Sequence, residues 1–147
     1  MTDWQTLIYD KAESEVLQAI MEAINRGEVL DGLTGLEEMI QLMSRREARE
    51  LESRLAILMA PVLKWKTRPP GTKSWRLTIA TQRDEIAGLR RDAPRFTKEY
   101  ILAEVWEKAM QRAGRLAEAD MDRPPAFQEL TWEEVFEDPY DERTAGQ

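Results

Sequence analysis

The sequence contains no cysteine and no histidine among its 147 residues. The absence of cysteine excludes disulfide bonds, thiol nucleophiles and thiolate metal sites. The absence of histidine excludes the Ser-His-Asp triad, an imidazole general base and zinc sites built on imidazole. Any catalysis would have to use carboxylates, Lys, Tyr or Ser, or a hard metal ion held by oxygen ligands.

Long apolar runs are also missing. No run approaches the roughly 18–20 residues needed to span a membrane. The first residues, MTDWQTLIYDKAESE, have neither the basic start nor the apolar centre of a signal peptide. We therefore expect a cytoplasmic protein that makes no membrane contact. A hydrophobic content of 42% with 33% charged residues is typical of a folded chain, and we predict one domain over residues 1–140 followed by a polar tail, 141–147.

The apolar residues recur at helical spacing, and nothing alternates with a period of two. We predict an all-α fold: a four-helix, mostly antiparallel bundle with a long second helix and a short C-terminal fifth helix. The predicted helices cover about 3–26, 34 to the low sixties, 74–91, 98–119 and 132–137. On the first helix, one apolar face is expected to contain Val16, Leu17, Ile20, Met21 and Ile24.

Several residues predict where these helices begin and end. Gly27 stands where a left-handed C-terminal cap would fall. Capping-box patterns place one helix start at Thr34 and another at Thr131, and Thr97 is predicted to cap the fourth helix. Pro61 lies inside the pattern of the second helix and is expected to kink or end it.

Charge changes sign along the chain. Residues 64–98 contain ten Lys/Arg against three Asp/Glu, a net charge of +7. Residues 1–63 contain six basic against twelve acidic side chains, and residues 99–147 contain five against thirteen, so both flanks are acidic. A basic segment in an acidic protein either contacts a negatively charged partner or docks the chain's own acidic flanks. The sequence leaves both interpretations open.

Aromatic residues stand among the bases of this segment. The set is Lys64, Trp65, Lys66, Arg68, Lys73, Trp75 and Arg76. Cations that hold phosphates and rings that stack on bases are typical of nucleic-acid contacts. The alternative is that both tryptophans anchor the core and the bases pair with acidic helices.

A polar cluster is also predicted between the second and third helices. Gln82 falls at the centre of an otherwise apolar face with Trp75, Ile79, Ile86 and Leu89. A buried amide must find partners or cost about 1–3 kcal/mol. The residues expected in this cluster are Glu47, Arg54, Gln82 and Arg83. They form either a network that fixes helix register or a pocket for an anion.

Two helical stretches resemble a known family. They read ELESRLAILMAPVLKW and KSWRLTIATQRDEIAGLRRDAP. They are similar to the uncharacterised bacterial family catalogued as domain of unknown function 29, and the similarity extends over roughly residues 9–141. The matching residues are Ser53, Arg54, Leu55, Leu63, Lys64, Trp65, Ser74, Trp75, Thr78, Ile79, Gln82, Arg83, Ile86, Leu89 and Pro94. The resemblance implies an all-α bundle without an established biochemical role. Pro61 replaces the family's usual His, so an activity that needs that imidazole is not expected here.

We expect a non-enzymatic protein-interaction module, such as an adaptor or an antitoxin-like protein, whose partner is another protein. The alternative is a nucleic-acid-binding protein that acts through residues 64–98. A weaker alternative is a carboxylate-metal enzyme, since pairs such as Glu104 and Glu107 could hold Mg²⁺. No intact catalytic or metal motif occurs, so we predict no catalytic residue, metal ligand or cofactor. The oligomeric state is left open.

Overall fold

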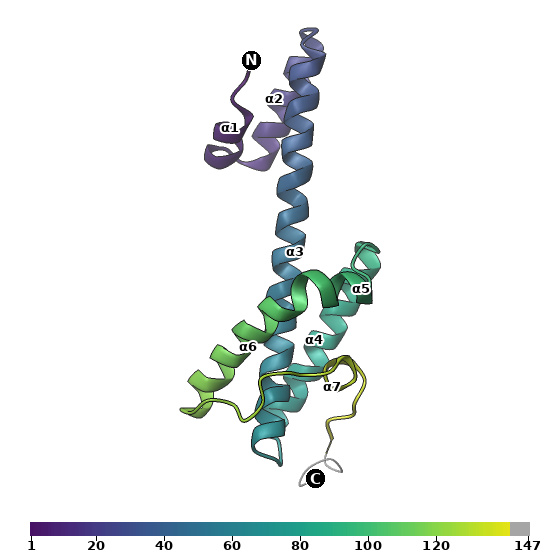
Figure 1. The fold of residues 1–147 in the computed structure, drawn as a ribbon. Helices are drawn as coiled ribbons and strands as arrows, with labels where there is room; N and C mark the ends of the chain where they lie inside the picture. Colours follow the sequence, from purple (N-terminus) through teal and green to yellow (C-terminus); the bar gives the residue numbers. More distant parts are fainter. Residues whose placement is uncertain (142–147) are drawn as a thin grey trace. The chain divides into compact units, whose positions relative to one another are not determined.

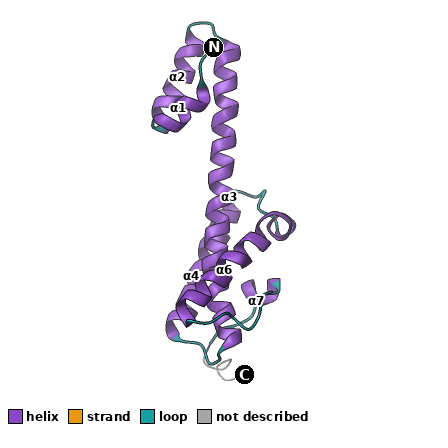
Figure 2. Cartoon of the chain, turned by 60° about the vertical axis from the view of Figure 1, so that its left-hand side comes forward, coloured by secondary structure: helices purple, strands orange, loops and turns teal. Residues whose placement is uncertain are grey.

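A computed structural model describes residues 1–141 of the chain, which form helices and loops without a strand (Figures 1 and 2). The helices are α1 (Trp4–Asp10), α2 (Glu13–Asn25), α3 (Val29–Thr67), α4 (Lys73–Asp92), α5 (Lys98–Tyr100), a π-helical turn η1 (Ile101–Val105), α6 (Trp106–Met121) and α7 (Trp132–Phe136). The predicted all-α class is confirmed, and so are the long helix and the short C-terminal one. The predicted polar tail, apart from Asp141, lies outside the described residues.

The chain divides into two compact units, residues 1–47 and 48–147. The N-terminal part of α3 belongs to the first unit, and the rest of this 39-residue helix belongs to the second. The predicted domain of residues 1–140 spans both units. Among the described helices, none is long and apolar enough to cross a membrane.

The first unit packs α1 and α2 against the start of α3. Its buried side chains are Trp4, Val16, Ile20, Ala23 and Met39. Two glycines of α3, Gly32 and Gly35, allow the helices to come very close. A Cβ atom on Gly35 would lie 2.8 Å from Ile20 and from the Trp4 ring, so only glycine fits there without a shift.

Asp31 ties the N-terminus to α3. Its carboxylate accepts hydrogen bonds from the Thr2 hydroxyl (2.6 Å), the Thr2 backbone N–H (3.2 Å) and the Trp4 indole N–H (3.0 Å). The hydrogen bond from the Thr2 hydroxyl has the largest effect on the pKa of Asp31, and all three bonds lower it. The carboxylate therefore helps to hold Trp4 in the core of the first unit.

The turn between α2 and α3 begins as predicted but ends differently. Gly27 adopts a left-handed conformation with φ of 88°, which confirms the expected cap. The prediction that the next helix starts at Thr34 was wrong, because α3 already begins at Val29. Thr34 lies inside the helix, and its hydroxyl donates to the Leu30 carbonyl at 3.0 Å. Close packing at Gly32 and Gly35 compensates for the low helix propensity of glycine.

The first predicted helix is broken in two. Trp4, Leu7 and Ile8 belong to a separate short helix, since α1 ends at Asp10 and α2 starts at Glu13. Asp3 caps α1 by accepting from the Thr6 backbone N–H at 3.1 Å.

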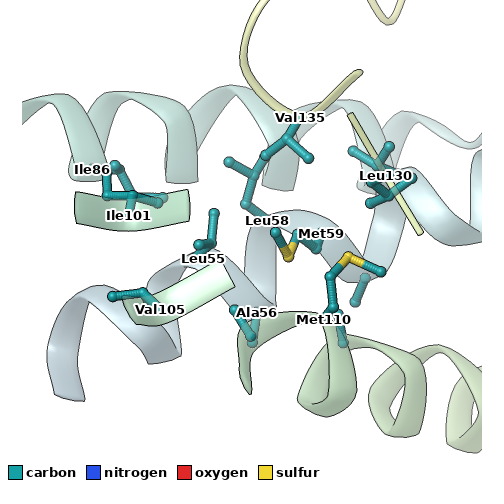
Figure 3. Packing of buried hydrophobic residues seen from close by; sticks show 14 of the residues in the cluster. Leu55, Ala56, Leu58, Met59, Ile86, Ile101, Val105, Met110, Leu130 and Val135 are labelled. Atoms are coloured by element: carbon teal, nitrogen blue, oxygen red, sulfur yellow. The ribbon is translucent and has the colours of Figure 1, made fainter. Parts of the chain in front are cut away.

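The second unit is built around the C-terminal part of α3, as Figure 3 shows. Leu55, Leu58 and Met59 of α3 point into a cluster with side chains from α4, η1, α6, α7 and the segment before α7. Pro61 does not end the helix, which continues to Thr67. Residues 58–63 are all buried, so their packing outweighs the roughly 3 kcal/mol that an interior proline costs.

The π-helical turn changes the register of the predicted fourth helix. Helical spacing places Ile101, Leu102, Val105, Ala109 and Ala113 on one inward face. The structure buries four of them, but Leu102 is 43% exposed, so the prediction was wrong for Leu102. A π-turn adds a residue to the repeat and rotates the positions beside it. The Thr97 cap and the Thr131–Glu134 capping box are confirmed by their hydrogen bonds.

Two helical glycines provide a test of the close packing in the first unit. Gly35→Ala is expected to destabilise the protein by about 1–3 kcal/mol, because the new methyl overlaps Ile20 and the Trp4 ring. Gly114→Ala in α6 is the matched control. Its Cβ would meet no atom within 4 Å, so stability should rise by about 0.5–1 kcal/mol. Urea unfolding followed by circular dichroism measures both, and equal effects would contradict the close approach.

Candidate functional site

Lys64 is the first cation of the basic segment, and it is used within the chain. Its ammonium donates to the Asp120 carboxylate of α6 at 2.6 Å and lies 5.1 Å from the centre of the Trp75 ring on α4. Only 12% of the Lys64 side chain is exposed. The hydrogen bond from Lys64 lowers the pKa of Asp120. Lys64 thus joins three helices of the second unit.

Lys66 reaches α7 in the same way. Its ammonium lies 2.8 Å from the Glu134 carboxylate and 4.3 Å from the centre of the Phe127 ring. Burial raises the pKa of Glu134, but hydrogen bonds from Lys66 and Thr131 outweigh burial and hold the pKa below its ordinary value. One carboxylate therefore completes the capping box of α7 and fixes that helix to α3.

Arg83 holds the other end of α7. Its guanidinium donates to the carbonyls of Val135 (2.8 Å) and Asp138 (2.9 Å), with a longer bond to Glu134 (3.4 Å). The last carbonyls of a helix lack partners within the helix, and a cation there is favoured by the helix dipole. Burial lowers the pKa of Arg83. The guanidinium thus acts as a C-terminal cap supplied by α4.

Tyr140 completes this arrangement, which we call the α7 clamp: Lys66, Arg83 and Tyr140. The Tyr140 hydroxyl donates to the Glu134 carbonyl at 2.7 Å, and its ring lies 5.4 Å from the Arg83 guanidinium carbon. Burial raises the pKa of Tyr140, so it stays protonated as a donor.

Both predicted tryptophans are core anchors. Trp65 is buried and packs edge-to-face on Tyr140, with ring centres 5.2 Å apart. Gly71 in the following loop lies against Trp65, since a Cβ there would overlap the ring. Trp75 is half-buried against the same core. The Trp65 ring is therefore part of the core, and the Trp75 ring is partly exposed at its edge.

The rest of the basic segment divides between the interior and the surface. Arg90 donates to the Phe96 carbonyl at 2.9 Å and lies 5.5 Å from the centre of the Trp132 ring, and Lys98 lies 5.3 Å from the same ring. Arg76 is half-buried, whereas Arg68 and Lys73 are exposed. Much of the basic segment therefore docks the chain's own acidic and aromatic C-terminal segment.

Three of the four residues predicted in the polar cluster lie in the second unit. Glu47 belongs to the first unit, and Arg54, Gln82 and Arg83 belong to the second. Arg54 lies 3.6 Å from Glu50 and 3.8 Å from Glu85, while Arg83 is engaged by the α7 clamp. The Gln82 side-chain oxygen is buried without a hydrogen-bond partner among the described residues.

A partly exposed apolar surface of the first unit combines residues of the apolar face predicted for the first helix with apolar residues of α3. On α2 the buried residues are Val16, Ile20 and Ala23, and the residue after each is exposed and apolar. On α3 the buried residues are Gly32, Gly35 and Met39, and the residue after each is again apolar. We call this surface the hairpin face; it contains Leu17, Met21, Ile24, Val29, Leu33, Leu36, Ile40 and Met43.

The two stripes lie on the same side of the hairpin. Each stripe residue directly follows a buried residue, and one residue along a helix is a rotation of about 100° about its axis. Each stripe is therefore rotated by about 100° from the buried face of its own helix. Because α2 and α3 are antiparallel neighbours, this rotation brings both stripes to one side. Helix α1 lies on the opposite side. The side chains that are partly buried against the core of the first unit are Leu7, Ile8, Ala19, Leu36 and Leu42, so Leu36 of the α3 stripe is the least exposed part of the hairpin face. Met21 is 63% exposed and Ile40 is 61% exposed.

The comparisons with known proteins decide the family. The family model described as "Domain of unknown function DUF29" matches residues 8–141. The chain belongs to this family. The resemblance noted in the sequence is thereby confirmed, and DUF29 covers both units. No match was found among curated proteins or among solved structures. Within the described part of this DUF29 chain, no group of three or more acidic side chains is placed to hold a metal ion.

The α7 clamp can be tested by Arg83→Lys. Lysine keeps the charge but cannot donate to several carbonyls at once, and hydrogen bonds of a charged group contribute about 1.5–3 kcal/mol. We expect amides of residues 132–138 to exchange with solvent at least tenfold faster. Arg91→Lys on the same helix is the control, because Arg91 is exposed. Unchanged exchange in Arg83→Lys would contradict the clamp.

Proposed function

We propose that this DUF29 protein is a non-enzymatic protein-interaction module that binds a partner protein through the hairpin face. The observation that carries the proposal is the continuous apolar side of α2 and α3, opposite the side on which α1 lies. Contiguous exposed apolar patches are uncommon on proteins that act alone and are typical of protein-binding surfaces. The exposed residues come from two adjacent helices, which is how a groove for a third helix is made.

The energetic argument favours a helical partner. Burying a Leu, Ile or Met side chain contributes about 1.5–3 kcal/mol. Val29, Leu33, Leu36, Ile40 and Met43 are spaced alternately by four and three residues, the repeat with which one helix packs along another. A partner helix that covers this stripe and the α2 residues Leu17, Met21 and Ile24 would close a helical bundle.

The charge of the first unit indicates the kind of helix. Residues 1–47 contain four Lys/Arg against ten Asp/Glu, a net charge of −6. Glu37 is exposed beside the α3 stripe, and Glu15 and Glu22 are exposed on the outer side of α2. A second copy would bring two surfaces of the same charge together, whereas a basic amphipathic helix would be attracted. We therefore propose a partner that presents a basic amphipathic helix.

Nucleic-acid binding through residues 64–98 is the other function proposed from the sequence. The structure offers it less support, because Lys64, Lys66 and Arg83 already bind groups of the chain itself. Phosphate contacts would also make affinity fall log-linearly with salt, whereas an apolar docking surface would depend on salt only weakly. Binding measured at two salt concentrations distinguishes the two functions.

The hairpin face can be tested with one matched pair of variants. A tagged chain is used to isolate partners from nuclease-treated bacterial lysate, and each identified partner is then titrated by calorimetry. Ile40→Glu should weaken binding at least tenfold, because it places a charge in the centre of the apolar stripe. Gln41→Glu adds the same charge at the exposed neighbouring residue, which points away from the stripe, and should leave affinity unchanged.

Circular dichroism confirms that both variants fold. Equal affinity of Ile40→Glu and Gln41→Glu would refute docking at this face. Recovery of nucleic acid alone, in samples without nuclease, would favour the alternative function instead.

A further inference from the structure

The second unit contains an open groove of about 610 Å³ that the hairpin face does not involve. One wall is α6, which contributes Trp106, Met110 and Gly114, and the other is the segment 125–130 that leads to α7. The volume lies within the roughly 300–1,000 Å³ typical of sites that take a small ligand or a side chain. Every lining residue belongs to the second unit.

The groove combines an apolar floor with two carboxylates. Leu63, Met110 and Leu130 are buried apolar residues, and Phe127 of the loop wall is 41% exposed. Glu107 and Glu129 also line the groove; both are exposed, and neither makes an ion pair within the described residues. Lys66 lies over the Phe127 ring, but its charge is taken up by Glu134. The floor of the groove is therefore apolar, and the carboxylates of Glu107 and Glu129 make its edge negative.

Local structure holds both walls in place. The π-helical turn ends immediately before Trp106 and sets the register with which α6 presents Trp106 and Met110. The loop wall is attached to α3 by the Ala126 backbone N–H, which donates to the Thr67 hydroxyl at 3.1 Å. At Gly114 a Cβ would meet no atom within 4 Å, so the α6 wall leaves open space there.

We infer that this groove binds an arginine side chain, together with a neighbouring apolar residue, from a peptide segment of a protein partner. Charge complementarity identifies the occupant: a guanidinium can pair with carboxylates while its planar face stacks on an aromatic ring. The apolar neighbour would cover the floor. This inference rests on the proposed role in protein binding, but it uses a different surface and different variants.

Short probe peptides test the inference on the full chain. The probes are acetyl-Leu-Arg-Leu-amide and the same peptide with citrulline, which keeps the shape of arginine without its charge. The arginine peptide should bind in the millimolar range, as expected for so small a ligand, and shift the NMR signals of the Trp106 indole and the Gly114 amide. The citrulline peptide should bind several-fold more weakly.

Two sets of variants locate the site. Gly114→Leu should fill the groove and abolish binding of the arginine peptide, while Gly88→Leu, a glycine of α4 outside the groove, should not. Glu107→Gln combined with Glu129→Gln should weaken binding several-fold, and Glu118→Gln on the same helix should have no effect. Ile40→Glu should also leave peptide binding unchanged, which separates this site from the hairpin face.

Three results would overturn the inference. These are no binding of the arginine peptide at millimolar concentration, equal binding of the citrulline peptide, and unchanged binding to Gly114→Leu. Sedimentation of the chain alone tests whether a second copy of the chain occupies the groove instead. Self-association that Gly114→Leu abolishes would mean that a second copy fills the groove.

Discussion

The C-terminal half of α3 is the constraint on which the second unit depends. Leu51, Leu55, Leu58 and Leu63 are wholly buried there, and α4, η1, α6 and α7 all contribute to the core around them. A helix that is buried on so much of its surface has few positions left for charge. The two lysines near its end, Lys64 and Lys66, must therefore find acidic partners close by, and Asp120 and Glu134 provide them.

This requirement explains much of the charge inversion along the chain. The acidic C-terminal segment does not stand apart from the basic segment but is folded onto it, through the α7 clamp and through Trp132 beneath Arg90 and Lys98. Partly buried ion pairs contribute modest net stability, because desolvation offsets much of the attraction. Their clearer effect is to fix the position of a five-residue helix that has too few residues to be stable alone.

Local features were predictable from the sequence, and those that depend on packing were not. Gly27, Thr97 and Thr131 act through hydrogen bonds or dihedral angles within a few residues, so their roles could be inferred directly. The start of α3 at Val29 depends on glycines that allow α2 to approach, which no local rule indicates. The apolar face of Val16, Leu17, Ile20, Met21 and Ile24 was predicted, but periodicity does not show which of its residues another element covers.

In the candidate site, too, local features could be predicted from the sequence and features that depend on packing could not. Trp65 and Trp75 could be recognised as possible anchors, yet only the structure shows which bases are already engaged. Lys64, Lys66 and Arg83 are used in internal contacts, whereas Arg68, Lys73 and Arg91 of the same basic segment stay exposed. The hairpin face and the groove between α6 and residues 125–130 are both largely apolar. They belong to different units and are formed by different helices. The proposed partners, positively charged amphipathic segments of protein, would complement these two surfaces in both charge and hydrophobicity. The absence of histidine and cysteine is consistent with such a role, because binding of this kind requires neither residue.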